Sequence, residues 1–210
     1  MYDIPYFKEA DHALIIEFMK AHSFATLIGC AEDLPVATQV PLLIKERGEK
    51  LVLNGHIMRQ TDHHKALCKN ANVLCVFTGA HAYVSAKLYD EPKTASTWNY
   101  LSVQVSGTLR FVPDHELISI LQQTTNHYER DPASPSNFEQ LPEDYISKLA
   151  KAIEGFEIEV TSIRHVFKLS QNKSKAEHAR IVGSLAAGGP GEQAIASEMS
   201  ARSAALTSKI

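Results

Sequence analysis

The stretch STWNYLSVQVSG, residues 96–107, has the alternating pattern of a β-strand over most of its length. Every second residue from position 103 to 107 is small and apolar, and these residues share one face of an extended chain. The only tryptophan of the chain, Trp98, lies near the start of the stretch, with Tyr100 two residues further on. We therefore expect a strand over residues 98–111 whose first residues carry aromatic and hydrogen-bonding groups.

The same alternation, bounded by turn residues, predicts further strands along the chain. Their residues are 24–30, 35–46, 49–57, 72–79, continued by the strand-like segment 80–89, and 155–170. Helical periodicity predicts helices over 8–21, 60–70, 113–130 and 143–153. About six strands with helical insertions, and no repeated βαβ pattern, indicate a small barrel surrounded by helices rather than a doubly wound sheet. The predicted class is α+β, mainly β.

The composition of the chain changes after Ser170. The segment 171–210 is rich in alanine and contains GGPG at 188–191, which predicts two helices broken at that point. A weak apolar stripe runs through these helices, at Ile181, Leu185, Ile195 and Met199. We therefore predict a main domain over 1–170 and a C-terminal helical appendage over 171–210, which either docks on a partner subunit or frays.

Composition and charge argue against several classes of protein. The 210 residues carry a formal net charge of −3, so no overall basic field attracts nucleic acid or an anionic membrane. The three cysteines are odd in number and lack CxxC spacing, which is typical of reduced thiols. The first residues do not have the pattern of a secretory signal, and no apolar run reaches the ~20 residues that span a bilayer. We expect a cytoplasmic protein with no membrane segment.

One polar cluster lies in NGHIMRQTDHHK, after the strand expected at 49–57. His56, Arg59 and Gln60 lie at or before the first turn of the next expected helix, and Lys65 follows within it. Free helix amides, the helix dipole and the two cations could together hold a phosphate group. The alternative is a solvated helix start with a structural histidine.

Three further clusters lie near strand ends, in HAYVSAKLY, TWNY and KLSQNKS. Tyr83 and Ser85 share one face of the first, which is otherwise a plain strand. The second offers an aromatic wall and amide groups suited to a planar heterocycle, although Trp98 could equally be a packing residue. The third lies within 164–180, where five Lys or Arg accompany one Glu. That segment is either a site for phosphate or nucleic acid, or a helix capped by Ser174 with a solvated basic face.

Other familiar site motifs do not occur in the sequence. His63 and His64 are adjacent, so they would point in different directions on a helix, and neither HxxxH nor HExxH is present. We therefore expect no metal site. GxSxG, the P-loop and GxGxxG do not occur either, so hydrolase, nucleotidase and Rossmann interpretations lack their local signatures.

Six motifs in order resemble the PaiB family of FMN-binding negative transcriptional regulators. They are MYDIPYF, VATQVPLLI, NGHIMRQ, HAYVSAKLY, TWNYLSVQVSG and KLSQNKS, and the resemblance extends from residue 1 to about residue 200. This resemblance implies an FMN-binding split β-barrel related to pyridoxamine-phosphate oxidases, with helices around it. It also implies a homodimer that holds FMN between its subunits, and a role in transcriptional repression.

The resemblance implies a set of cofactor-binding residues but no assigned catalytic residue. They are His56, Arg59, Gln60, Lys65, Tyr83, Ser85, Thr97, Trp98, Asn99, Tyr100, Lys168, Ser170 and Gln171. Arg59 and Lys65 would hold the FMN phosphate, and Lys168 and Ser170 would reach the cofactor across the dimer interface. The chain departs from the family pattern at Gln39, His63, Lys87 and Leu88, which affects the shape of the pocket.

Two functions remain open from the sequence. The first is an FMN-binding homodimeric regulator that contacts DNA, for which only residues 164–180 offer a basic face and no helix-turn-helix is identifiable. The second is a flavin-dependent oxidoreductase that acts on a small molecule. No acid–base pair in the sequence requires catalytic turnover.

Overall fold

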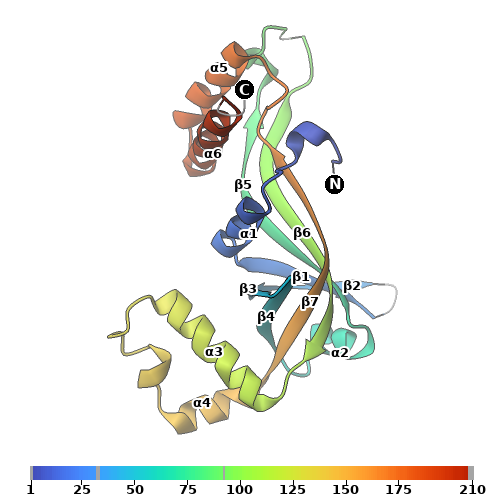
Figure 1. The fold of residues 1–210 in the computed structure, drawn as a ribbon, viewed down its shortest axis with the longest axis vertical. Coiled ribbons are helices and arrows are strands. Elements are labelled where there is room, and N and C mark those ends of the chain that lie inside the picture. The colour runs from blue at the N-terminus through green and yellow to red at the C-terminus, as the bar shows by residue number, and fades with distance from the viewer. Residues whose placement is uncertain (1, 32–33, 92, 208–210) are drawn as a thin grey trace. The chain divides into compact units, whose positions relative to one another are not determined.

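The computed structural model of the chain describes residues 2–31, 34–91 and 93–207 (Figure 1). In chain order its elements are the 3-10 helix η1 (Pro5–Phe7), α1 (His12–Ala21), β1 (Phe24–Cys30), β2 (Pro35–Pro41), β3 (Leu43–Arg47), β4 (Lys50–Met58), α2 (Asp62–Lys69), β5 (Asn72–Val84), η2 (Ala86–Leu88), β6 (Thr97–Phe111), α3 (Asp114–Glu129), η3 (Phe138–Gln140), α4 (Glu143–Ala150), β7 (Ile153–Lys168), α5 (Lys175–Ala186) and α6 (Pro190–Thr207). This is the predicted α+β class, built on one large sheet.

The strands form one seven-stranded sheet in the order β2-β1-β5-β6-β7-β4-β3. Strand β1 pairs antiparallel with β2 and β5, and β4 pairs antiparallel with β3 and β7. Only Leu42 separates β2 from β3, yet these strands lie at the two ends of the order. The sheet must therefore curl until its two edges come close together, which is the geometry of a partly open barrel.

The segment 35–46 is two strands, and the prediction of a single strand was wrong. Pro41 ends β2 because it has no N–H group with which to continue the ladder. The next residue, Leu42, is buried, and its N–H donates to the Ser23 carbonyl at 2.9 Å. The sheet consequently has seven strands where the sequence predicts about six.

Helix α1 begins at His12, although the sequence predicts a start near residue 8. The side chain of Asp11 accepts a hydrogen bond from the Ala13 N–H at 2.9 Å, and Glu9 accepts one from the Asp11 N–H at 3.0 Å. Side-chain acceptors of this kind stabilise the non-helical turn before a helix. The other predicted helices agree with the structure apart from their ends.

The chain divides into two compact units, which we call unit 1 and unit 2. Unit 1 comprises Met1–Ile15, Thr78–Val103 and His165–Ile210, and unit 2 comprises Ile16–Phe77 and Gln104–Arg164. The predicted domain boundary at residue 170 stays a prediction.

Each unit has its own buried side chains. In unit 1, the apolar stripe predicted on the two C-terminal helices is buried, at Ile181, Leu185, Ile195 and Met199. Met199 also accepts a hydrogen bond from the buried Asn99 side chain at 3.4 Å, which ties α6 to β6. In unit 2 the largest fully buried side chains include Leu27, Leu53, Phe77 and Phe156.

Candidate functional site

The predicted phosphate site lies in unit 2, where β4 ends and α2 begins. Its central cation, Arg59, already has partners in the same unit. The guanidinium donates to the Ile153 carbonyl at 2.8 Å and to the Glu154 carboxylate at 3.0 Å, and Asp114 lies 3.8 Å away. An anion that binds Arg59 has to share it with Glu154.

The start of α2 is also capped by side chains of the chain itself. Thr61 accepts a hydrogen bond from the His64 N–H at 3.1 Å, and Asp62 accepts one from the His63 N–H at 2.8 Å. These bonds satisfy two of the free amides that attract an anion to a helix start. Gln60 is exposed and has a left-handed backbone, with φ of 66°. Lys65 is exposed, so its ammonium group is accessible there.

Two histidines of unit 2 have buried ring nitrogens that make no hydrogen bond with any described residue. They are Nδ1 of His56 and Nε2 of His63. The other ring nitrogen of His63 lies 2.7 Å from the Thr38 hydroxyl. Burial lowers the pKa of both histidines. Because buried polar atoms normally have partners, an unpaired nitrogen such as that of His56 indicates a place where a bound group could supply one.

Exposed aromatic rings gather on one face of unit 1, and we call Trp98, Tyr83 and His81 the aromatic surface. The Trp98 ring lies 5.7 Å from the Tyr83 ring and 5.9 Å from the His81 ring, measured between centroids. Trp98 is 52% exposed and Tyr83 is 51% exposed. Large aromatic side chains that share an exposed face are typical of a binding surface.

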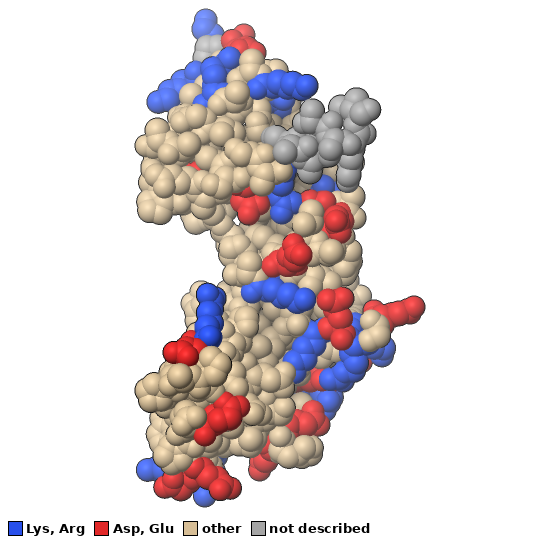
Figure 2. Space-filling view, turned by 60° about the vertical axis from the view of Figure 1, so that its left-hand side comes forward, with Lys and Arg blue, Asp and Glu red and all other residues tan. Residues whose placement is uncertain are grey.

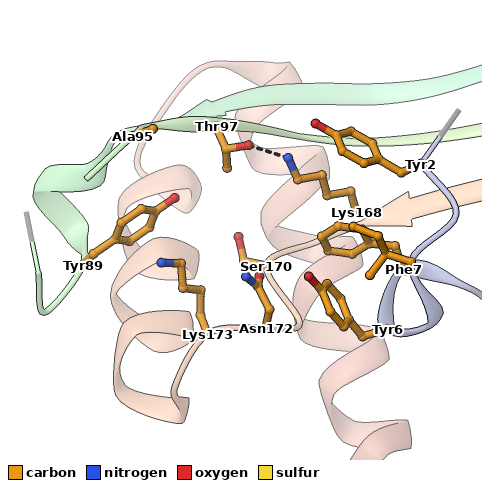
Figure 3. Close-up of a pocket in the computed structure, with 11 residues that line it drawn as sticks. Tyr2, Tyr6, Phe7, Tyr89, Ala95, Thr97, Lys168, Ser170, Asn172 and Lys173 are labelled. Atoms are coloured by element: carbon orange, nitrogen blue, oxygen red, sulfur yellow. Dashed lines mark hydrogen bonds between the residues drawn. The ribbon is translucent and has the colours of Figure 1, made fainter.

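A pocket of about 250 Å³ lies in unit 1 and contains three of the predicted residues, Thr97, Lys168 and Ser170 (Figure 3). We call it the Lys168 pocket. Its remaining walls come from Tyr2, Ile4, Tyr6, Phe7, Tyr89, Ala95, Asn172 and Lys173. None of these eight residues is among the predicted cofactor-binding residues, although Tyr2 to Phe7 lie within the motif MYDIPYF and Asn172 and Lys173 lie within KLSQNKS.

Lys168 dominates the chemistry of this pocket. Its ammonium group donates to the Thr97 hydroxyl and lies 5.1 Å from the centre of the Tyr2 ring and 5.7 Å from that of Phe7. No carboxylate of a described residue lies within ion-pair distance of it. Burial lowers the pKa of Lys168. The pocket therefore contains a partly buried positive charge that the acidic side chains of the described residues do not balance.

Three predicted residues near the pocket mainly hold its framework. Ser170 has a left-handed backbone, with φ of 61°, and its hydroxyl exchanges hydrogen bonds with the buried Asn99 amide at 3.0 and 3.1 Å. Gln171 accepts from the Leu169 N–H at 2.7 Å and donates to the Phe167 carbonyl. These bonds fix the turn that follows β7, whose last residue is Lys168.

The two other predicted residues of unit 1 lie outside the pocket. Ser85 caps the short helix η2, since its hydroxyl accepts a hydrogen bond from the Lys87 N–H. Tyr100 follows the same outward face of β6 as Trp98, and burial and the nearby Tyr2 raise its pKa. The structure thus brings Thr97, Lys168 and Ser170 together, and it places Trp98 with Tyr83.

Within residues 2–31, 34–91 and 93–207, no group of three His, Cys, Asp or Glu side chains could hold a metal ion. None of the helices in this part of the chain is both long and apolar enough to cross a lipid bilayer.

A curled antiparallel sheet flanked by helices is the architecture of the split-barrel class of proteins. Residues 1–162 match the family model described as "Putative FMN-binding domain", and the chain belongs to this family. The match ends before Lys168.

One relative and two solved structures are similar to this chain. The chain is 28% identical to "Protease synthase and sporulation protein PAI 2" of Bacillus subtilis (strain 168), over 88% of this chain and 89% of that protein. Its fold is similar to that of the FAD and heme binding protein from Mycobacterium smegmatis, with a TM-score of 0.57 and 17% identity, covering 86% and 80% of the two chains. Its fold is also similar to that of the flavocytochrome Anf3 from Azotobacter vinelandii, with a TM-score of 0.56 and 16% identity, over 80% of this chain and 72% of that chain.

These comparisons confirm three predictions from the sequence: the PaiB-like family, the split-barrel fold and FMN as the cofactor. The residues of this chain fit parts of the cofactor. The unpaired His56 nitrogen and the accessible Lys65 suit its polar end, and the aromatic surface suits its flat ring. The Lys168 pocket, at about 250 Å³, is smaller than the ~300–1,000 Å³ typical of ligand sites.

Proposed function

We propose that the chain forms a homodimer that binds FMN between its subunits and acts as a negative regulator of transcription. The observation that carries this proposal is the aromatic surface of unit 1. Trp98 and Tyr83 leave about half of each side chain exposed, whereas a flat heterocycle and a second subunit would cover them. The name of the Bacillus subtilis relative refers to protease synthase and sporulation, which supports a regulatory role.

In this proposal the two ends of FMN meet different groups. Arg59 and Lys65 of one subunit hold the phosphate, and His56 gives its free ring nitrogen to the cofactor. The aromatic surface of the partner subunit covers the flavin ring. FMN, when bound, supplies hydride or one-electron chemistry. The protein groups position it and exclude water from it.

The basic segment 164–180 offers limited support for direct contact with DNA. Lys168 and Lys173 line the pocket, and Arg180 donates to Asp90 and to the Leu88 carbonyl. Figure 2 shows Lys and Arg side chains gathered at the end of unit 1 that carries α5, and mixed charges elsewhere on that face. If the regulator contacts DNA, this end is the surface that we propose for it.

The absorbance spectrum of the purified protein tests cofactor binding, and sedimentation velocity with and without FMN tests the dimer. We expect a flavin spectrum and a dimer that FMN stabilises. A protein that binds FMN as a monomer contradicts the proposed arrangement. Binding to DNA should weaken with salt and on Lys175→Gln. Reduction by NADH or NADPH with steady turnover, and no DNA binding, would assign the oxidoreductase function instead.

A further inference from the structure

The Lys168 pocket has charge of one sign only. Two ammonium groups, those of Lys168 and Lys173, line it, and none of its lining residues is acidic. Lys173 lies 3.4 Å from the centre of the Tyr89 ring and 4.0 Å from Glu177, which is only a distant partner. Lys168 has no carboxylate partner among the described residues. The pocket therefore favours an anion.

Four of the eleven residues that line the pocket are aromatic. Tyr2, Tyr6 and Phe7 come from the N-terminal segment, and Tyr89 follows η2 (Figure 3). Aromatic rings of this kind can pack against a planar group. The volume of about 250 Å³ has room for a single aromatic ring with its acid group.

We propose that the Lys168 pocket binds a small planar organic anion, of the class of an aromatic carboxylate, at a site separate from FMN. The Lys168 ammonium is the main partner of the carboxylate. The Thr97 hydroxyl accepts its hydrogen bond from Lys168, so its own hydrogen can be donated to the ligand. The ring of the ligand lies among the aromatic walls.

The position of the pocket explains why this site is separate from the flavin. Adjacent residues of a strand point to opposite faces, so Thr97 faces the pocket while Trp98 belongs to the aromatic surface. The pocket is also built within one chain and one unit, so an apo monomer can bind the ligand. The sequence predicts that Lys168 contacts FMN across a dimer interface, and the experiment below distinguishes that role from this one.

Calorimetric titration of the full chain with benzoate and with benzamide tests the proposal. The two probes have similar shape, but only benzoate carries a charge. We expect saturable binding of benzoate that weakens with salt, and at least tenfold weaker binding of benzamide, because a charge-assisted hydrogen bond is lost. Lys168→Gln should weaken benzoate binding about tenfold or more, and Lys168→Arg should retain part of it. Lys148→Gln, an exposed lysine on α4, is the matched control and should change nothing.

The same titration in protein saturated with FMN completes the test. We expect an unchanged benzoate affinity, and an unchanged FMN affinity in Lys168→Gln. Equal binding of benzoate and benzamide by the unmodified protein, or no saturable binding of either, overturns the proposal. Displacement of benzoate by FMN also overturns it, and assigns Lys168 to the flavin site. The unmodified protein alone decides these outcomes, so they do not depend on the folding of a variant.

Discussion

Replacing Glu154 by glutamine tests whether Arg59 holds the FMN phosphate. In the structure the carboxylate of Glu154 takes a hydrogen bond from Arg59 at 3.0 Å and lies 2.7 Å from the His64 ring nitrogen. Glu154→Gln keeps the size of the side chain but removes its charge. An incoming phosphate then no longer competes with the Glu154 carboxylate for Arg59. Arg59 keeps its hydrogen bond to the Ile153 carbonyl. We expect Glu154→Gln to bind FMN more tightly than the unmodified protein does.

The size of the effect follows from the exposure of the pair. The Arg59 side chain is 35% exposed and that of Glu154 is 19% exposed, so the pair lies between a surface ion pair and a buried one. Surface pairs contribute up to about 1 kcal/mol, and hydrogen bonds to charged groups contribute about 1.5 to 3 kcal/mol. We take about 1 to 2 kcal/mol for the competition, which corresponds to roughly five- to thirtyfold tighter FMN binding.

Riboflavin, which lacks the phosphate, is the control ligand for this assay. Apo protein and the variants Glu154→Gln and Arg59→Ala are titrated with FMN and riboflavin, and flavin fluorescence reports binding. We expect Glu154→Gln to change FMN affinity alone. Arg59→Ala should weaken FMN about tenfold or more and leave riboflavin nearly unchanged. Equal changes for both ligands in both variants would refute the assignment and leave Arg59 as a structural partner of Glu154.

Four further measurements test other parts of the structure. Adding FMN to apo protein should quench the fluorescence of Trp98, the only tryptophan, whereas unchanged emission at saturation would remove Trp98 from the flavin surface. Diluting FMN-loaded protein should release monomer and flavin together. Excess FMN should move the midpoint of dimer dissociation to lower protein concentration, because FMN binding and dimerisation are linked. Sedimentation across a dilution series measures this midpoint, and a monomer that keeps its flavin contradicts the prediction. The Glu9 N–H donates to Nε2 of His165 at 2.8 Å, and burial, followed by the nearby Lys8, lowers the pKa of His165. The contribution of this histidine to stability is therefore complete above its unfolded pKa of about 6.5 and is lost as the pH falls through the lower folded pKa. Thermal melts of His165→Gln should consequently depend less on pH below about 6.5 than those of the unmodified protein. Burial raises the pKa of Cys75 to about 12, so a thiol reagent at neutral pH should label the exposed Cys68 in native protein and Cys75 only after unfolding, and rapid native labelling of Cys75 would contradict its burial.

Local patterns in the sequence were sufficient for most of the fold. The alternation in β6 and the apolar stripe on α5 and α6 each depend on neighbouring residues, and the structure confirms both elements. Pro41 marks the end of β2 in the sequence, but the hydrogen bond from Leu42 to Ser23, which separates β2 from β3, joins residues 19 positions apart and has no local pattern. The turn at Ser170 was missed for a related reason. A left-handed backbone there has no glycine to mark it, and the buried Asn99 stabilises it from another strand.

The candidate site also could not be predicted fully from local sequence. A Lys or Arg near the end of a strand has the same local pattern whether or not an acidic side chain lies beside it in the folded protein. Arg59 and Lys168 both have this position, and local motifs favoured Arg59 as the anion site. The partner of Arg59 is Glu154, which lies 95 residues away along the chain, whereas Lys168 has no such partner among the described residues. An anion at Arg59 has to displace a carboxylate, and an anion at Lys168 has only to replace solvent. The strength of each anion site is therefore set by distant acidic residues, which only the folded chain brings near.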